Sequence, residues 1–151
     1  MNAQAYIFVG LTGLSRVDKE VRDLEKARTC VYQANYHLIC ATKYRRKVLV
    51  GTVTVRLGDL LKEIAERHGY PLLTARVHDG DHMHLFVSAP PRVSIPEMIR
   101  VFKCITAKRL FTEFPEIKKQ LWGGHLWSEG YAVRTAGNVT STKIEEYINK
   151  T

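Results

Sequence analysis

One stretch of the sequence specifies the fold more than any other: residues 79–91, DGDHMHLFVSAPP. Asp79-Gly80 is a strong hairpin signal, because tight two-residue turns need residues that tolerate a positive φ. Residues 82–89 then read as the return strand, in which side chains alternate between the two faces of a sheet. The apolar positions 83, 85, 87 and 89 are expected to face the core. His82 and His84 would therefore project together from the opposite face.

The two histidines of this strand form a candidate metal site. Residues two apart in a strand lie about 6.6 Å from each other along the backbone and point to the same side. Two imidazoles so placed can hold one divalent cation and leave positions for water or substrate oxygens. The alternative is a pair of solvated strand histidines, and the spacing alone leaves both interpretations open.

The segments around this strand predict an α+β fold. Further strands are predicted over residues 29–43, 71–77 and 126–135, and helices after Ser15 and over residues 52–68, 94–114 and 141–150. After the leading helix the order is β-α-β-β-α-β-α, which is close to the ferredoxin-like split βαβ pattern of RRM-like domains. We therefore expect an antiparallel sheet with helices on one face and an appended C-terminal helix.

Composition limits the class of protein. The chain has 151 residues, 45% of them hydrophobic and 25% charged, which fits one globular domain and excludes a disordered or fibrous chain. The longest apolar stretch, residues 6–14, is too short to cross a bilayer, so we expect no membrane association. Three widely spaced cysteines argue against a disulfide framework and fit a reducing cytoplasm.

The charge balance favours an anionic partner. Lys and Arg total 23 against 15 Asp and Glu, a formal net charge of +8, which is typical of nucleic-acid binding, although a merely basic protein is the alternative. An aromatic residue lies inside the first basic cluster, which suits phosphate contacts combined with base stacking. For Arg100 and Lys103, which lie on the predicted helix 94–114, a solvated helix face is the favoured interpretation. The candidate nucleic-acid contacts are Lys43, Tyr44, Arg45, Arg46, Lys47, Arg100 and Lys103.

Several segments, taken together and in order, resemble a known family: the small single-tyrosine HUH transposases of bacterial and archaeal insertion sequences (insertion-sequence 200-like). The residues that carry the resemblance are 36–49, 81–91, 94–115, 126–131, Val139 and 146–148. Each segment alone is weak evidence, but their joint order over roughly residues 26–150 is specific. Residues 1–25 look like an N-terminal extension of a single catalytic domain spanning residues 26–151.

The resemblance implies site residues and partners. Tyr147 would be the catalytic nucleophile, although spacing alone favours a core tyrosine beside Ile144 and Ile148. His82 and His84 would bind Mg²⁺ or Mn²⁺. Tyr131 matches an aromatic position that is not the nucleophile and is expected to be packed. The family commonly has a Gln metal ligand where this chain has Thr151, which leaves the third ligand open.

The resemblance also implies the reaction. The expected function is a DNA transposase that cleaves and rejoins single-stranded DNA through a 5′-phosphotyrosine intermediate with a divalent metal. The partners would be DNA hairpins at the ends of the element and a second copy of the chain, in a homodimer with exchanged C-terminal helices. Two alternatives stay open: a non-catalytic nucleic-acid-binding protein, and a decayed transposase on the same fold.

Overall fold

The computed structural model describes residues 24–136, which belong to two compact units that divide after Gln33. In the first unit, β1 (Glu25–Lys26) pairs with β2 (Val31–Tyr32) in a small antiparallel hairpin. The second unit begins at Ala34 and contains the sheet and the helices described below. The predicted helices after Ser15 and over 141–150 lie outside the described residues.

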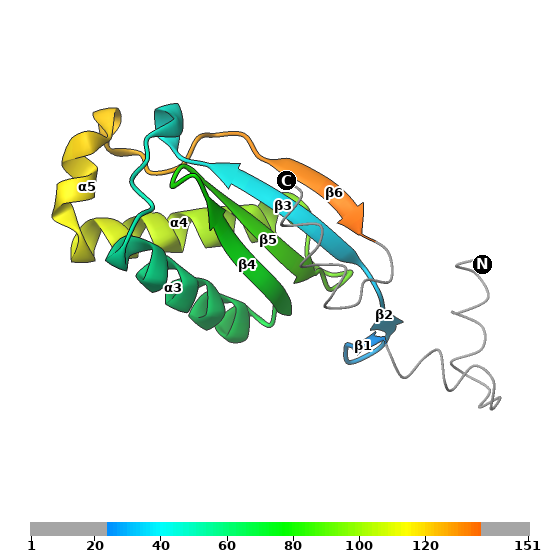
Figure 1. The fold of residues 1–151 in the computed structure, drawn as a ribbon. Coiled ribbons are helices and arrows are strands. Elements are labelled where there is room, and N and C mark those ends of the chain that lie inside the picture. Colours follow the sequence, from blue (N-terminus) through cyan, green and yellow to red (C-terminus); the bar gives the residue numbers. More distant parts are fainter. Residues whose placement is uncertain (1–23, 137–151) are drawn as a thin grey trace, which may run out of the picture. The chain divides into compact units, whose positions relative to one another are not determined.

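The second unit is built on a four-stranded antiparallel sheet (Figure 1). Its strands are β3 (Asn35–Ala41), β4 (Leu72–His78), β5 (His82–Ser88) and β6 (Ala132–Ala136). Their spatial order is β4-β5-β3-β6, so that each βαβ crossover spans one intervening strand. This is the split βαβ arrangement, and it confirms the predicted α+β fold with a ferredoxin-like sheet.

Two long helices cover one face of this sheet (Figure 1). Helix α3 is Thr52–His68 and helix α4 is Ile95–Glu113. As predicted, alternate side chains of β5 point into the core between the helices and the sheet. Met83 and Leu85 are fully buried there. Burying a large apolar side chain stabilises a fold by about 1.5–3 kcal/mol, so this face fixes which way the strand is turned. Within residues 24–136, no helix combines the length and the hydrophobicity needed to cross a bilayer.

Local sequence signals set the ends of these elements as predicted. Gly69 ends α3 in the left-handed conformation, with a φ of 67°. Ser94 caps α4 by accepting a hydrogen bond from the Glu97 N–H. Asp79 and Gly80 both have positive φ, at 52° and 70°, as the predicted hairpin turn between β4 and β5 requires.

Two predictions about the irregular parts of the chain are wrong, and two short elements were missed. The predicted strand 29–43 is divided between β2 and β3, and its end forms a 3₁₀ turn, η1 (Lys43–Arg45). The short helix α5 (Pro115–Gln120) and the turn η2 (Trp122–Gly124) were not predicted. The predicted strand 126–135 begins only at Ala132.

The indole of Trp127 gives the physical reason for the late start of β6. Trp127 is buried, and its Nε1–H donates to Thr106 Oγ1 of α4 over 2.9 Å. Its backbone makes a single isolated bridge with Thr42 instead of a continuous ladder. The segment stays bonded to the end of β3 through the Ser128 N–H and the Ala41 carbonyl, and only the continuous ladder of β6 starts later, at Ala132. Tyr131, expected to be packed, has an exposed fraction of 39%.

We predict that Thr106→Val destabilises the protein by about 1–3 kcal/mol, because it leaves the buried Trp127 N–H without an acceptor. Thr112→Val is the matched control. Like Thr106, Thr112 donates its hydroxyl to the carbonyl four residues earlier in the helix, but its side chain is exposed. Urea unfolding followed by tryptophan fluorescence measures both. Equal, small changes for the two variants would contradict the role given to Thr106.

Candidate active site

The face of the sheet opposite the helices brings together four histidines from three strands. In the register, His82 lies opposite Ala41 of β3 and opposite His78 of β4. His84 is two residues further along β5 and therefore on the same face. His37 of β3 pairs with Phe86, the next residue of β5 on that face. The four imidazoles thus form one cluster, which we call the histidine cluster: His37, His78, His82 and His84.

His84 is held firmly within this cluster. The residue is 1% exposed, and its Nδ1 lies 2.7 Å from Nε2 of His37 in a buried hydrogen bond. Burial, followed by the neighbouring imidazoles, lowers the pKa of His84 to about 4. Its Nε2 is buried and has no hydrogen-bond partner among the described residues. His84 is therefore neutral at pH 7, with Nε2 available as a ligand atom.

His82 is oriented in the same way by a different partner. Its Nδ1–H donates to Oδ1 of Asp81 over 2.6 Å. The Asp81 carboxylate also accepts from Arg45 Nε at 3.1 Å. The hydrogen bond from His82, followed by the one from Arg45, lowers the pKa of Asp81, so this carboxylate is ionised at neutral pH. His82 thus directs its Nε2 away from the carboxylate.

These contacts fit a divalent metal. Metal-binding histidines typically engage their second ring nitrogen with a carboxylate or another acceptor, which fixes the tautomer and the ring orientation. Both His82 and His84 have that engagement at Nδ1. Oxygen ligands are also near, because ligand atoms of Asp79, Asp81 and His82 lie within 4.8 Å of one another. The alternative of a solvated histidine pair does not hold for His84, which is buried.

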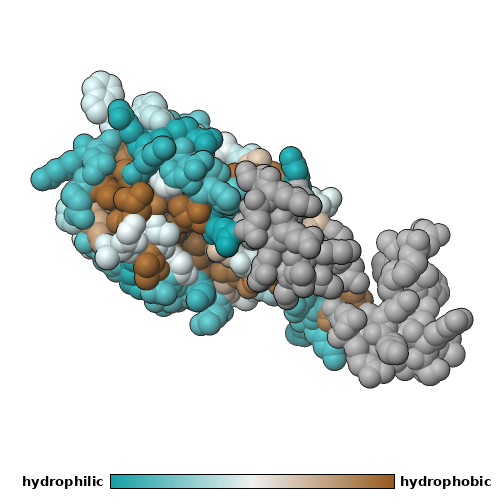
Figure 2. Space-filling view, in the orientation of Figure 1, coloured by the Kyte–Doolittle hydropathy of each residue, from teal (hydrophilic) through white to brown (hydrophobic). Residues whose placement is uncertain are grey.

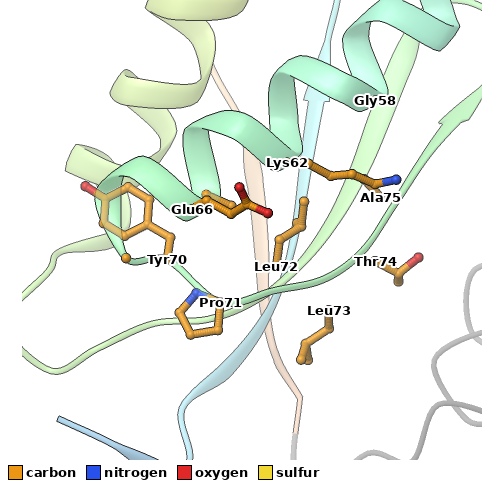
Figure 3. Close-up of a pocket in the computed structure, with 11 residues that line it drawn as sticks. Gly58, Lys62, Glu66, Tyr70, Pro71, Leu72, Leu73, Thr74 and Ala75 are labelled. Carbon is orange, nitrogen blue, oxygen red and sulfur yellow. The ribbon is translucent and has the colours of Figure 1, made fainter.

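The cavity shown in Figure 3 lies elsewhere, between the C-terminal half of α3 and β4. Its volume is about 660 Å³, and it is lined by residues such as Lys62, Glu66 and Tyr70. None of the histidines of the cluster lines it. Figure 2 shows hydrophobic residues between hydrophilic ones at the left end of the molecule, where Figure 1 labels α3 and α5. The candidate chemistry and this cavity are thus separate features.

Comparison with known proteins identifies the family. The family model described as "Transposase IS200 like" matches residues 30–151. The chain is 41% identical over 126 residues to the ISDra2 transposase TnpA of Deinococcus radiodurans, covering 83% of this chain and 89% of that protein. The chain belongs to the IS200-like transposase family.

Further relatives agree with this assignment. The transposase for insertion sequence element IS200 of Salmonella typhimurium is 29% identical over 117 residues, covering 78% of this chain and 76% of that protein. A crystal structure of a Deinococcus radiodurans R1 protein assigned as a transposase superposes with a TM-score of 0.70 at 40% identity, covering 84% and 97% of the two chains. A REP-associated tyrosine transposase bound to a REP hairpin superposes with a TM-score of 0.52 at 14% identity, covering 84% and 68%, and shows the shared fold.

The basic residues that were predicted to contact nucleic acid differ in their surroundings within the transposase. Arg45 pairs with Asp81, and Arg100 makes a two-bond ion pair with Glu97. Lys103 Nζ donates to three consecutive backbone carbonyls, those of residues 128–130. These three cations therefore already have partners within the chain.

The basic segment comprises residues 43–47 and follows the end of β3. Thr42 anchors it, because its N–H and its hydroxyl both donate to the Asp81 carbonyl. Tyr44 is 61% exposed, and Lys43 Nζ lies 5.4 Å from its ring centroid. Arg46 and Lys47 are exposed. Exposed cations and an aromatic ring therefore belong to the segment that Thr42 fixes to Asp81, the residue before His82. Tyr147 lies outside the described residues.

Sequence reasoning missed the residues that complete the cluster. His37 alternates with apolar residues within the predicted strand 29–43, but nothing local indicates that it meets His84. His78 directly follows the predicted strand 71–77. Asp81 was noted only as part of the strand motif. An alignment of the strands by their buried positions would have found His37 and His78, since both then share a face with His82.

We predict that His84→Ala destabilises the transposase by about 2–4 kcal/mol, whereas His82→Ala costs less than about 1 kcal/mol. His84 fills a buried site and its removal takes away the buried hydrogen bond with His37, whereas the His82 side chain is partly exposed. Urea unfolding in the presence of a chelator measures the difference. The exposed His125→Ala is the control, with no change expected. Equal losses at His82 and His84 would contradict the asymmetric burial.

Proposed function

We propose that this transposase cleaves and rejoins single-stranded DNA through a covalent bond between Tyr147 and a 5′ phosphate. The observation that carries the proposal is the pair His82 and His84, each oriented through Nδ1 so that Nε2 can bind a cation beside a basic segment. The resemblance of residues 146–148 to the family's catalytic element supports Tyr147 as nucleophile. The transposase family shows the class of reaction, and the tyrosine chemistry is the proposed refinement.

In the proposed cleavage step the Tyr147 oxygen attacks phosphorus, losing its proton. An oxygen–phosphorus bond forms to the tyrosine, and the bond from phosphorus to the 3′ oxygen breaks. The leaving oxygen takes a proton and becomes a 3′-OH. The reverse reaction with another 3′-OH rejoins DNA and needs no ATP, because the phosphodiester energy is kept in the tyrosine ester.

His82 and His84 would hold the divalent metal, Mg²⁺ or Mn²⁺. When bound, such an ion stabilises negative charge that develops on a phosphate oxygen. The chain's own residues fix the two imidazoles in the orientation that metal binding needs, because His37 orients His84 and Asp81 orients His82. The low pKa of His84 keeps its lone pair available at neutral pH.

The DNA substrate is proposed to be a hairpin with a single-stranded flank. The relative bound to a REP hairpin supports this substrate, because it has the same fold. Lys43, Arg46 and Lys47 would contact phosphates, and the exposed ring of Tyr44 would stack on a base. The backbone bonds from Thr42 to Asp81 and from Leu49 to Gly80 hold both ends of this segment at the turn before His82, which would bring the bound strand to the histidine cluster.

The catalytic domain is proposed to comprise residues 26–151 and to act as a homodimer with exchanged C-terminal helices. Exchange would bury Ile144 and Ile148 against the partner and bring Tyr147 to the partner's histidines. A non-catalytic nucleic-acid binder explains the charge, but it gives the two oriented imidazoles no role. A decayed transposase differs from an active one only in the cleavage assay described next.

Tyr147→Phe is expected to abolish the covalent protein–DNA adduct while leaving DNA binding within about twofold, because only the nucleophilic oxygen is lost. Single-stranded DNA carrying the element's own end is incubated with the transposase and Mn²⁺ and separated on a denaturing gel. Tyr131→Phe is the matched control and should form the adduct normally. Adduct formation by the Tyr147→Phe variant would exclude Tyr147 as the nucleophile.

Mixing two inactive variants tests the exchanged dimer. Tyr147→Phe subunits keep their histidines and His82→Ala subunits keep their tyrosine, so a heterodimer would have one complete site. Random mixing should restore about a quarter of the native adduct yield, since half of the dimers are mixed and each has one of two sites. Subunit exchange is verified with a size tag on one variant. Verified heterodimers without activity would show that Tyr147 acts within its own subunit.

A further inference from the structure

His78 is the member of the histidine cluster that the proposed reaction leaves without a role. It is the last residue of β4 and lies directly opposite His82 across the hairpin. Directly opposed residues of an antiparallel pair have Cβ atoms about 4.5–5.5 Å apart and point to the same face. His78 therefore stands on the same face as His82 and His84, at the end of the hairpin where Asp81 orients His82.

The spacing of the three rings matches a shared metal ion. The ring centroid of His78 lies 4.7 Å from that of His84 and 5.6 Å from that of His82, and the last two are 5.0 Å apart. Three imidazoles bound to one ion at about 2.0–2.2 Å have ring centroids on the order of 5 Å apart. The strand register thus delivers three rings at nearly the separation that coordination needs.

The polar atoms of the rings give a second, independent observation. Nε2 of His78 is buried and has no hydrogen-bond partner among the described residues, and the same holds for Nε2 of His84. Buried polar atoms are normally satisfied, so an orphaned one calls for an unseen partner. Two orphaned nitrogens on rings in edge contact point to a single partner that both can bind.

Oxygen ligands compete less well for that role. The group formed by Asp79, Asp81 and His82 is more closely spaced than the three imidazoles, whose rings must turn to share an ion. However, the carboxylate of Asp81 already accepts hydrogen bonds from His82 and Arg45, and Asp79 is exposed. Binding an ion through Asp81 would disrupt the bond that orients His82. Turning the His78 ring toward a shared ion breaks no hydrogen bond of its Nε2, which has none among the described residues.

We propose that His78 is a third imidazole ligand of the metal site, which therefore prefers Co²⁺ or Mn²⁺ to Mg²⁺. The inference rests on the proposed metal site and adds a ligand and a selectivity to it. Imidazole nitrogen binds first-row transition ions well, and Mg²⁺ prefers oxygen. A site with three imidazoles should discriminate against Mg²⁺ more strongly than a site with two.

Metal titration of the tag-free chain tests this proposal without DNA. Co²⁺ binding is followed by the visible d–d absorption and by calorimetry, and Mg²⁺ binding by calorimetry. His78→Ala should weaken Co²⁺ binding at least about tenfold and change the d–d spectrum, while Mg²⁺ binding changes less than about threefold. His78→Gln repeats the test with a side chain of more similar size. Thermal unfolding of both variants in chelator verifies that they are folded.

Three further variants separate the possible results. The exposed His125→Ala should leave Co²⁺ binding unchanged. If His82→Ala abolishes Co²⁺ binding and the folded His78 variants retain native affinity and spectrum, His78 is not a ligand and the proposed two-histidine site stands. If Asp79→Asn weakens Co²⁺ binding more than His78→Ala does, the carboxylate group holds the ion and the proposal is overturned. Unchanged Co²⁺ binding in both His78→Ala and His82→Ala would reject the proposed metal site itself.

Discussion

The antiparallel register of β5 is the constraint on which the rest of the site depends. Met83 and Leu85 are fully buried beneath the helices, so the strand cannot slip by one residue without moving them out of the core and turning His82 and His84 into it. The same constraint forces His82 and His84 to the opposite face. Because β5 pairs with β3 on one side and β4 on the other, it also decides that His37 and His78 meet those two residues. One hydrophobic pattern therefore assembles a polar cluster from three strands.

Asp81 connects this cluster to the basic segment. Its carbonyl accepts two hydrogen bonds from Thr42, and its carboxylate holds both His82 and Arg45. The ring that is proposed to bind a cation and the segment that is proposed to bind phosphates are thus fixed by one residue. Replacing Asp81 would disturb both, which makes it a poor choice for separating metal binding from DNA binding. Substitutions of His82 and of Lys47 can separate the two, since His82 is proposed to bind only the metal and Lys47 only phosphate.

Local signals in the sequence predicted much of the fold, and only part of the site. The capping residue Ser94, the terminating Gly69 and the Asp79-Gly80 turn act within a few residues of themselves, and each is found where it was expected. The start of β6 depends instead on the bond between Trp127 and Thr106, which are far apart in the sequence. The common direction of the two strand histidines follows from alternation alone. Their partners do not, because His37 is 47 residues from His84 and meets it only once the strands are paired.

Burial of the histidines also decides which charge the site can accept. Burial, followed by the charge of Arg134, lowers the pKa of His37, and burial is the main cause that lowers the pKa of His84 to about 4. Both imidazoles are therefore neutral at pH 7, and adjacent rings oppose protonation of one another. The neutral ring of His84 offers a lone pair to a cation, and neither His37 nor His84 offers positive charge to a phosphate. In the proposed site, phosphate binding would therefore fall to the exposed cations of the basic segment, and metal binding to the adjacent histidines.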